Sequence, residues 1–333
     1  MRRPPTMMAL GMAVLVGVAG SAGVIYSARE RSEAVERVPG LTEEDLAAND
    51  GPAENFLLVG SDSREGVDVG DPENASTGDE AEVSGQRSDT IMILRREENG
   101  GASLLSLPRD LWVPIADTDH SAKINSAYNE GPERLVRTVT QALGVPIHHY
   151  VEVDFNGFTR LVDEIGGVQI CVDYPAQDEN TGLRLNPGCQ VLDGAQALAY
   201  ARSRHYEEFV DGDWRGDEEA PDLARIGRQQ QFIRGAVDKL LRRIRRNPLR
   251  LGDLIGVATD SVRIDGDLDP VEAANALRAA AEEGLDTYTL PVVGVERDGQ
   301  SALELDEGAD AILDYFRGVA PVPPVTTTTE PGG

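Results

Sequence analysis

Short apolar runs bounded by turn-forming residues recur along the chain, and this pattern is typical of buried strands. Examples are NFLLVG at residues 55–60 and ASLLSL at 102–107. We therefore expect these segments to form a sheet inside the protein. The predicted strands cover residues 55–60, 90–94, 102–107, 150–155, 167–172 and 288–293.

Apolar residues at helical spacing lie between and after these strands. They predict helices over residues 132–143, 155–165, 193–200, 222–246 and 271–283, with Asp193 and Asp222 as N-caps. Because strands and helices interleave, we expect an α/β fold in which a central mixed β-sheet has helices on both faces.

The N-terminus carries a different pattern. Residues 7–26 are twenty residues without a charge, long enough to span about 30 Å of hydrocarbon. We expect an uncleaved single-pass membrane anchor after a cytoplasmic tail of residues 1–6. A cleaved signal peptide is the alternative. A linker over 27–51, an extracytoplasmic domain over 52–320 and a disordered Pro/Thr-rich tail over 321–333 would follow.

Charge and cysteine content narrow the class of protein. The chain has 58 acidic and 31 basic residues, a formal net charge of −27, which disfavours nucleic acid as a partner. Its two cysteines are Cys171 and Cys189. A single pair closing a short loop in an exported protein predicts a disulfide, and two unrelated buried thiols are the alternative.

Charged residues gather where the apolar runs begin or end. Strand ends are where open α/β sheets bind ligands. Arginine forks match phosphate oxygens, and a few carboxylates suit a hard cation. We therefore expect a phosphorylated ligand with a metal ion. Neither a P-loop nor a G-x-S-x-G motif occurs. The residues are Asp62, Arg64, Arg87, Asp89, Arg109, Asp110, Lys123, Arg202, Arg204, Arg225 and Gln229.

The pair Arg202 and Arg204 in YARSR is unusual for so acidic a chain. If the backbone is extended there, both side chains lie on one face and repel each other. Each arginine pairs with a nearby carboxylate in one interpretation. In the other, an anion lies between them.

Seven segments, in chain order between about residues 55 and 235, resemble the LytR-CpsA-Psr family of envelope proteins. They are NFLLVGSDSREG, RSDTIMIL, LLSLPRDLWVPI, KINSAYNEGP, HHYVEVDFNGFTRLVDEIGGV, LDGAQALAYARSRH and DLARIGRQQQF. The acidic stretch 65–86 is longer than the resemblance leads us to expect, and we interpret it as a mobile loop.

The resemblance implies a membrane-anchored protein that moves a glycopolymer from a polyprenyl-pyrophosphate carrier to peptidoglycan, with Mg²⁺, or Mn²⁺ in its place. It also implies that Asp62 and Asp89 hold the metal. The residues implied to surround the pyrophosphate are Arg64, Arg87, Arg109, Lys123, Arg202, Arg204, Arg225 and Gln229. A pyrophosphate would then lie across the arginines of YARSR.

The expected reaction is phosphoryl transfer, which depends mainly on positioning and charge stabilisation. Asp89 and Asp110 are both candidates for the base that accepts the hydroxyl proton, and Arg109 lies beside Asp110. A pyrophosphatase that uses water as the nucleophile is one alternative. A non-catalytic regulator is another, although six residues before the anchor cannot hold a DNA-binding helix-turn-helix.

Overall fold

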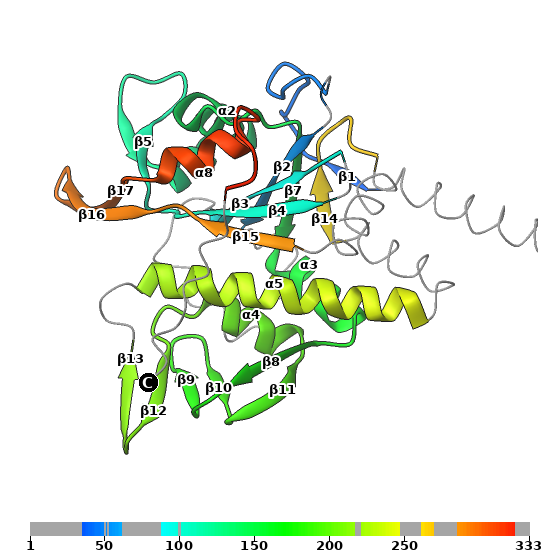
Figure 1. Ribbon diagram of the computed structural model, residues 1–333, viewed down its shortest axis with the longest axis vertical. Helices are drawn as coiled ribbons and strands as arrows, with labels where there is room; N and C mark the ends of the chain where they lie inside the picture. Colours follow the sequence, from blue (N-terminus) through cyan, green and yellow to red (C-terminus); the bar gives the residue numbers. More distant parts are fainter. Residues whose placement is uncertain are drawn as a thin grey trace, which may run out of the picture.

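The computed structural model describes residues 35–49, 51, 53–61, 88–98, 101–216, 221–246, 261–269 and 285–323. A seven-stranded sheet forms its centre (Figure 1), in the order β1-β14-β7-β2-β3-β4-β15. Parallel and antiparallel neighbours both occur, so the sheet is mixed, as expected. Its strands are β1 (Glu36–Arg37), β14 (Val262–Ile264), β7 (His149–Asp154), β2 (Glu54–Ser61), β3 (Ser88–Arg96), β4 (Ala102–Leu107) and β15 (Leu285–Thr289).

The central strands are apolar because both of their faces are covered. Side chains alternate between the faces, so Leu57 and Ile93 contribute to one core while Phe56 and Met92 contribute to the other. Helices α2 (Pro132–Leu143) and α8 (Ala309–Phe316) and the 3₁₀ helix η3 (Ile124–Glu130) cover the first face. Helix α5 (Pro221–Arg246) lies against the second (Figure 1).

A smaller unit lies on the other side of α5 (Figure 1). It contains helices α3 (Phe155–Glu164) and α4 (Gly194–Arg202) and the ribbon of β8 (Val168–Val172) with β11 (Gly188–Leu192). A four-stranded sheet completes it, in the order β10-β9-β12-β13. Those strands are β10 (Leu183–Leu185), β9 (Ala176–Asp178), β12 (Glu207–Val210) and β13 (Asp213–Gly216).

The predicted disulfide is confirmed in this smaller unit. Cys171 and Cys189 are cross-strand partners on β8 and β11, and their sulfurs are bonded. Two further hairpins lie beside the central sheet: β5 (Trp112–Pro114) with β6 (Ser121–Lys123), and β16 (Val292–Arg297) with β17 (Gln300–Leu305).

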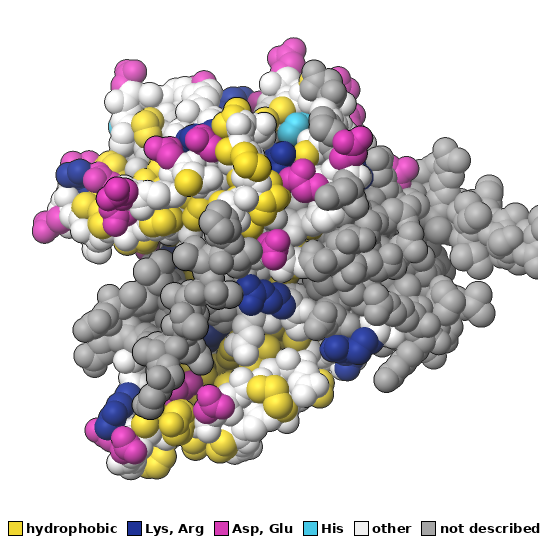
Figure 2. Space-filling view, viewed as in Figure 1, with side chains coloured by type: hydrophobic (Ala, Val, Ile, Leu, Met, Phe, Trp, Pro, Cys, Tyr) yellow, Lys and Arg dark blue, Asp and Glu magenta, His cyan; other side chains and the backbone are white. Residues whose placement is uncertain are grey.

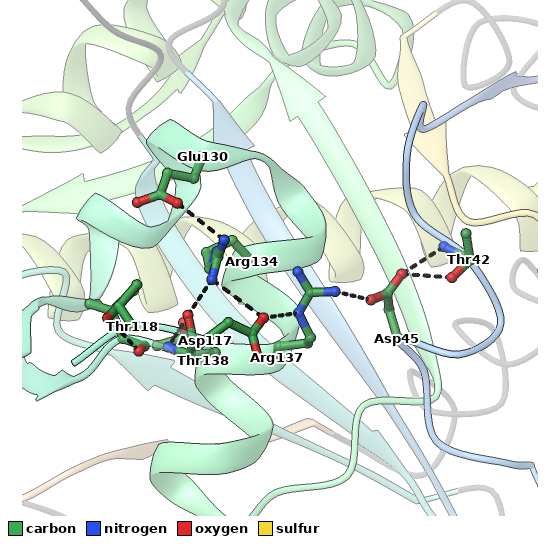
Figure 3. Close-up of polar contacts among 10 residues, drawn as sticks. Thr42, Asp45, Asp117, Thr118, Glu130, Arg134, Arg137 and Thr138 are labelled. Atoms are coloured by element: carbon green, nitrogen blue, oxygen red, sulfur yellow. Dashed lines mark hydrogen bonds and ion pairs between the residues drawn. The ribbon is translucent and has the colours of Figure 1, made fainter. Parts of the chain in front are cut away.

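Residues 35–49, which the sequence placed in a linker, pack on the folded domain. Val35 and Val38 are buried in the cores, and β1 joins the sheet edge. Asp45 accepts hydrogen bonds from Thr42 and forms an ion pair of 2.6 Å with Arg137 of α2 (Figure 3). The domain therefore begins earlier than residue 52.

Most predicted elements are confirmed, α2 and β4 with the same bounds. The predicted strand 288–293 is wrong as one element, because β15 ends at Thr289 and β16 begins only after Pro291. Asp222 is not an N-cap, since Pro221 already lies in α5, where proline suits the first helical position.

The predicted helix 271–283, loop 65–86, anchor 7–26 and most of the tail lie outside the described residues. Among the helices within the described part of the chain, none is both long and apolar enough to cross a membrane.

Candidate functional site

Strand topology brings most of the predicted site segments to one edge of the central sheet. β2 and β7 run parallel and end together, with Ser61 opposite Asp154. β3 runs the other way, so its first residue, Ser88, lies opposite Ser61. β4 then ends at the same edge, with Leu107 opposite Ile91. We call this boundary, where β2, β4 and β7 end and β3 begins, the strand edge.

The β2–β3 pair is irregular at the strand edge. Gly60 pairs with Thr90 and Ser61 with Ser88, so the register passes over Asp89. Such a bulge redirects the extra residue and is frequent beside active sites. The side chain of Asp89 and all of Asp62, Arg64 and Arg87 lie outside what the structure describes. Ser61, next to Asp62 in the sequence, and Ser88, between Arg87 and Asp89, are described and pair with each other at the strand edge.

Arg109, Asp110 and Lys123 meet just beyond the end of β4. The Lys123 Nζ is 3.0 Å from Asp110 Oδ1, and the Arg109 Nε is 3.6 Å from Asp110 Oδ2. The β5–β6 hairpin places Lys123 there by pairing it with Trp112. The Asn125 N–H also donates to the Arg109 carbonyl at 3.2 Å. The predicted LPRD and KIN motifs therefore form one cluster.

Helix α5 connects the strand edge to the YARSR segment. The Gln229 Nε2 donates both to Thr90 Oγ1 of β3 and to the Ala201 carbonyl of α4, each at 3.1 Å. Arg225 lies one turn earlier on the same helix face and is buried. Gln229, a predicted site residue on α5, therefore lies between β3 and the end of α4.

The two arginines of YARSR do not belong to a strand. Arg202 is the last residue of α4, and its guanidinium carbon lies 4.3 Å from the centre of the Phe155 ring. Phe155 begins α3 directly after β7, so Arg202 lies at the strand edge. Ser203 then ends the helix with φ −56° and ψ 126°, and Arg204 follows it.

Asp178, which the sequence did not single out, holds this turn. Its side chain is fully buried. Its Oδ2 accepts from the Ser203 hydroxyl at 2.6 Å and from the backbone N–H groups of Arg204 and His205 at 3.0 and 2.9 Å. Oδ1 accepts from the N–H groups of Asn180 and Thr181. The sequence Asp-Glu-Asn-Thr-Gly that begins at Asp178 is a turn signal, and it accounts for the contacts to Asn180 and Thr181 but not for those to residues 203–205.

The electrostatics of Asp178 favour its charged form. Burial alone would raise the pKa of this carboxyl, but the hydrogen bonds from Ser203, His205, Asn180 and Thr181 together lower the pKa below its ordinary value of 3.8. A neighbouring arginine also supports the turn: the Arg228 Nη2 donates to the Ser203 carbonyl at 2.7 Å, with its guanidinium over the Tyr206 ring.

No metal-binding group of three or more His, Cys, Asp or Glu side chains occurs within the described residues, which do not cover the carboxylates of Asp62 and Asp89. In the sequence, these two residues directly follow Ser61 and Ser88, which pair at the strand edge. Oxygen ligands from one or two carboxylates are what Mg²⁺ requires, so this donor set fits a divalent cation.

Comparison with known proteins agrees with the geometry. The model of the LytR_cpsA_psr family matches residues 18–313. The probable cell wall biosynthesis protein LcpB of Corynebacterium glutamicum is 35% identical over 79% of this chain and 61% of its own length. The chain therefore spans less than two thirds of that relative. The polyisoprenyl-teichoic acid–peptidoglycan teichoic acid transferase TagU of Halalkalibacterium halodurans is 30% identical over 81% of this chain and 82% of its own.

Solved structures share the fold. The LytR-Csp2A-Psr enzyme from Actinomyces oris aligns with a TM-score of 0.65 and 23% identity, over 85% of this chain and 94% of its own. TagT bound to LI-WTA aligns with a TM-score of 0.60 and 22% identity, over 86% of this chain and all of its own. Because the family model matches most of the sequence and the strand edge collects the motifs that carry the resemblance, the chain belongs to the LytR-CpsA-Psr family.

Proposed function

We propose that this protein transfers a glycopolymer from a polyprenyl-pyrophosphate carrier to a sugar hydroxyl of peptidoglycan. The convergence at the strand edge carries the proposal. β4, α4 and α5 bring described arginines from three separate segments to the strand edge: Arg109, Arg202 with Arg204, and Arg225. A pyrophosphate is the ligand that such a set of cations suits best. The transferase names of the relatives support the same conclusion.

The donor would lie with its phosphates against Arg202, Arg204, Arg225 and Arg109. The arginines are presented by ordered elements, so little conformational freedom is lost when the anion binds. The remaining members of the proposed pyrophosphate site are Arg64, Arg87, Lys123 and Gln229.

Asp62 and Asp89 are the residues that would hold Mg²⁺ or Mn²⁺. Such an ion neutralises charge on phosphate oxygens when bound. The bulge at Asp89 separates this residue from the regular ladder, which supports a role for its side chain at the strand edge.

The acceptor oxygen would attack the phosphorus next to the donor sugar. A new bond forms between that oxygen and phosphorus, and the bond to the bridging oxygen breaks. Polyprenyl phosphate leaves with the electron pair.

The hydroxyl proton passes to a carboxylate, either Asp89 or Asp110. Lys123 and Arg109 lie beside Asp110, so its negative charge is already partly compensated. The metal ion would compensate the charge of Asp89 in the same way, so both carboxylates stay candidates for the base.

The apolar segment 7–26 would anchor the protein in the cell membrane by a single span, with the folded domain outside the cell. This placement supports the function because the lipid carrier and the peptidoglycan acceptor then lie on the same side as the domain. The single disulfide agrees with an oxidising compartment.

The function is tested by incubating the full chain with a labelled polyprenyl-pyrophosphate glycan and peptidoglycan, with Mg²⁺ present. We expect Arg202→Ala and Arg204→Ala to slow transfer by roughly 10- to 100-fold, because each removes a charge-assisted contact worth about 1.5–3 kcal/mol. The melting temperature should change little, because the proposal assigns these arginines to the ligand rather than to the fold.

Arg297→Ala is the matched control, because Arg297 is half-exposed on the β16–β17 hairpin and pairs with Glu304. It should transfer at the original rate. If Arg202→Ala lowers the melting temperature but leaves transfer intact, the arginine is structural and the proposed site is wrong. Release of polyprenyl phosphate at the same rate without peptidoglycan would indicate a pyrophosphatase instead.

A further inference from the structure

The hairpin of β12 and β13, residues 207–216, exposes two large aromatic side chains. Phe209 and Trp214 are cross-strand partners, and their ring centres are 5.3 Å apart. Each is 39% exposed. Tyr174 lies close by and is 44% exposed, since the carbonyl of the next residue, Pro175, accepts from the Phe209 N–H at 2.8 Å. Exposed aromatic side chains gathered in this way mark an interaction surface.

The strand register places polar groups on the same face as the rings. Glu207 is two residues before Phe209 and therefore points the same way. Its cross-strand partner Gln177 donates to it from β9 at 3.1 Å. The other neighbour of Glu207 is Gly216, whose missing side chain leaves this part of the face open. Arg184 of β10 is opposite Gln177 and exposed.

The opposite face of this sheet belongs to the core of the smaller unit. Ala176, Leu183 and Leu185 are buried there. The rings therefore project outward from a sheet that is fixed from behind. In Figure 2, apolar and charged side chains are exposed together at the lower left, where Figure 1 places β12 and β13. We call the outward side chains of Gln177, Arg184, Glu207, Phe209 and Trp214 the aromatic face.

The charge of this region argues for an uncharged partner. The aromatic face has one carboxylate and one guanidinium, with an amide between them. The hairpin itself carries Glu207, Glu208, Asp211 and Asp213 against the single Arg215. Anionic lipid headgroups and anionic polymers would be repelled. A neutral polyhydroxyl chain fits, because its hydroxyls donate to Glu207 and Gln177 while its sugar rings cover the aromatic rings.

The aromatic face is also connected to the proposed donor site. Phe209 is five residues after Arg204, so an extended chain places them at most about 17 Å apart. Asp178 at the end of β9 fixes the backbone of Arg204 and His205, and Tyr206 packs against Arg228. The two sites therefore belong to one ordered unit, within the reach of a chain of several sugars.

We propose that the aromatic face binds the acceptor: a neutral glycan strand of N-acetylated hexosamines. The inference rests on the proposed function for the identity of the acceptor. Phe209 and Trp214 hold sugar rings, Glu207 and Gln177 hold their hydroxyls, and the strand continues toward the arginines.

Binding is measured directly with a tetrasaccharide of N-acetylglucosamine and the full chain. The chain has two tryptophans, Trp112 and Trp214. In Trp112→Phe, Trp214 is the sole reporter, and we expect the tetrasaccharide to change its fluorescence. Equilibrium dialysis with labelled tetrasaccharide should show at least tenfold weaker binding for Phe209→Ala and Trp214→Ala, with an unchanged melting temperature.

Val293→Ala removes a similarly exposed apolar side chain from the β16–β17 hairpin and should leave binding intact. Arg202→Ala should also bind the tetrasaccharide normally, which separates this inference from the donor site. Unchanged binding in Phe209→Ala and Trp214→Ala overturns the inference but leaves the proposed transfer standing. Quenching of Trp214 by brominated phosphatidylglycerol vesicles, without a response to the tetrasaccharide, would show a membrane contact and also overturn it.

Discussion

At the scale of single residues, Asp178 determines how the arginines of YARSR are presented. Two short turns that are far apart in sequence, 178–181 and 203–205, both direct backbone donors at this one carboxylate. Five hydrogen-bond donors on this buried carboxylate stabilise its charge. The position of Arg204 therefore depends on a carboxylate that need not contact the substrate.

We expect Asp178→Ala to lower the free energy of unfolding by roughly 2–4 kcal/mol, because donors stranded in the interior cost about 1–3 kcal/mol each. Transfer should fall as well, since Arg204 loses its support. Asp193→Ala is the matched comparison, because Asp193 only caps α4 at the surface and should cost about 1 kcal/mol. Urea denaturation measures both; equal losses would contradict this role for Asp178.

At the scale of elements, the packing of α4 on α3 sets where Arg202 lies. The two helices approach closely because Gly194 has no side chain. A Cβ there would lie 2.4 Å from the Thr159 carbonyl oxygen and 2.8 Å from the Thr159 Cα. Backbone atoms cannot move aside as a flexible side chain would. Any larger residue must therefore push α4 away from α3.

We expect Gly194→Ala to destabilise the protein by about 1–3 kcal/mol through overpacking, and to slow transfer because α4 carries Arg202. Gly227→Ala is the control of opposite sign. Nothing lies within 4 Å of a Cβ at Gly227, which lies in α5, so alanine should add up to about 1 kcal/mol of helix stability. If the melting temperatures of the two variants shift in the same direction, the packing explanation is wrong.

The elements that the sequence predicted well carry strong local signals. Helix α2 begins with Pro132 and ends before Gly144 in a left-handed conformation, and both residues mark helix ends. β9, β12 and β13 were missed because they are three or four residues long and partly polar. Their hairpin turn at Asp211-Gly212 has positive φ at both positions, a signal that the sequence did contain.

The candidate site was predictable as a set of motifs but not as a geometry. Charges at the ends of apolar runs indicated the strand edge, because strand ends converge in such sheets. The bulge at Asp89 depends on strand register, and the burial of Asp178 depends on two distant turns, so neither follows from local sequence. The aromatic face requires the pairing of four strands that the sequence did not predict, β9, β10, β12 and β13.

At the scale of the whole molecule, a net charge of −27 coexists with deeply buried carboxylates. Asp178 and Asp265 are both fully buried. Asp265 accepts from the N–H groups of Tyr150, Asp267 and Leu268 and lies 3.4 Å from the His149 Nδ1. Burial alone would raise the pKa of Asp265, but these contacts lower it below 3.8. Its ionised form therefore helps to join β7 to the segment after β14.

The two carboxylate populations respond to acid in opposite ways. Protonating surface carboxylates reduces self-repulsion as the pH approaches the isoelectric point of about 4.4, which favours the folded state. Protonating Asp265 or Asp178 removes an acceptor that buried donors require. Because their pKa is lower in the folded state, the unfolded chain takes up protons first. The stability they contribute is complete above their ordinary pKa and is lost as the pH falls from there through their lower pKa in the folded state.

We therefore expect the free energy of unfolding to hold or rise slightly from pH 7 to about pH 5 and then to fall steeply below about pH 4.

Asp265→Asn isolates the buried contribution, since it removes one titrating group while keeping the shape of the side chain. The variant should be less stable than the original protein at pH 7, because an amide cannot accept hydrogen bonds on both sides. It should lose less stability than the original between pH 5 and pH 3, because its side chain binds no proton. Urea denaturation across this range, at constant ionic strength, gives both values. Parallel curves for the two proteins would mean that Asp265 does not contribute to acid sensitivity.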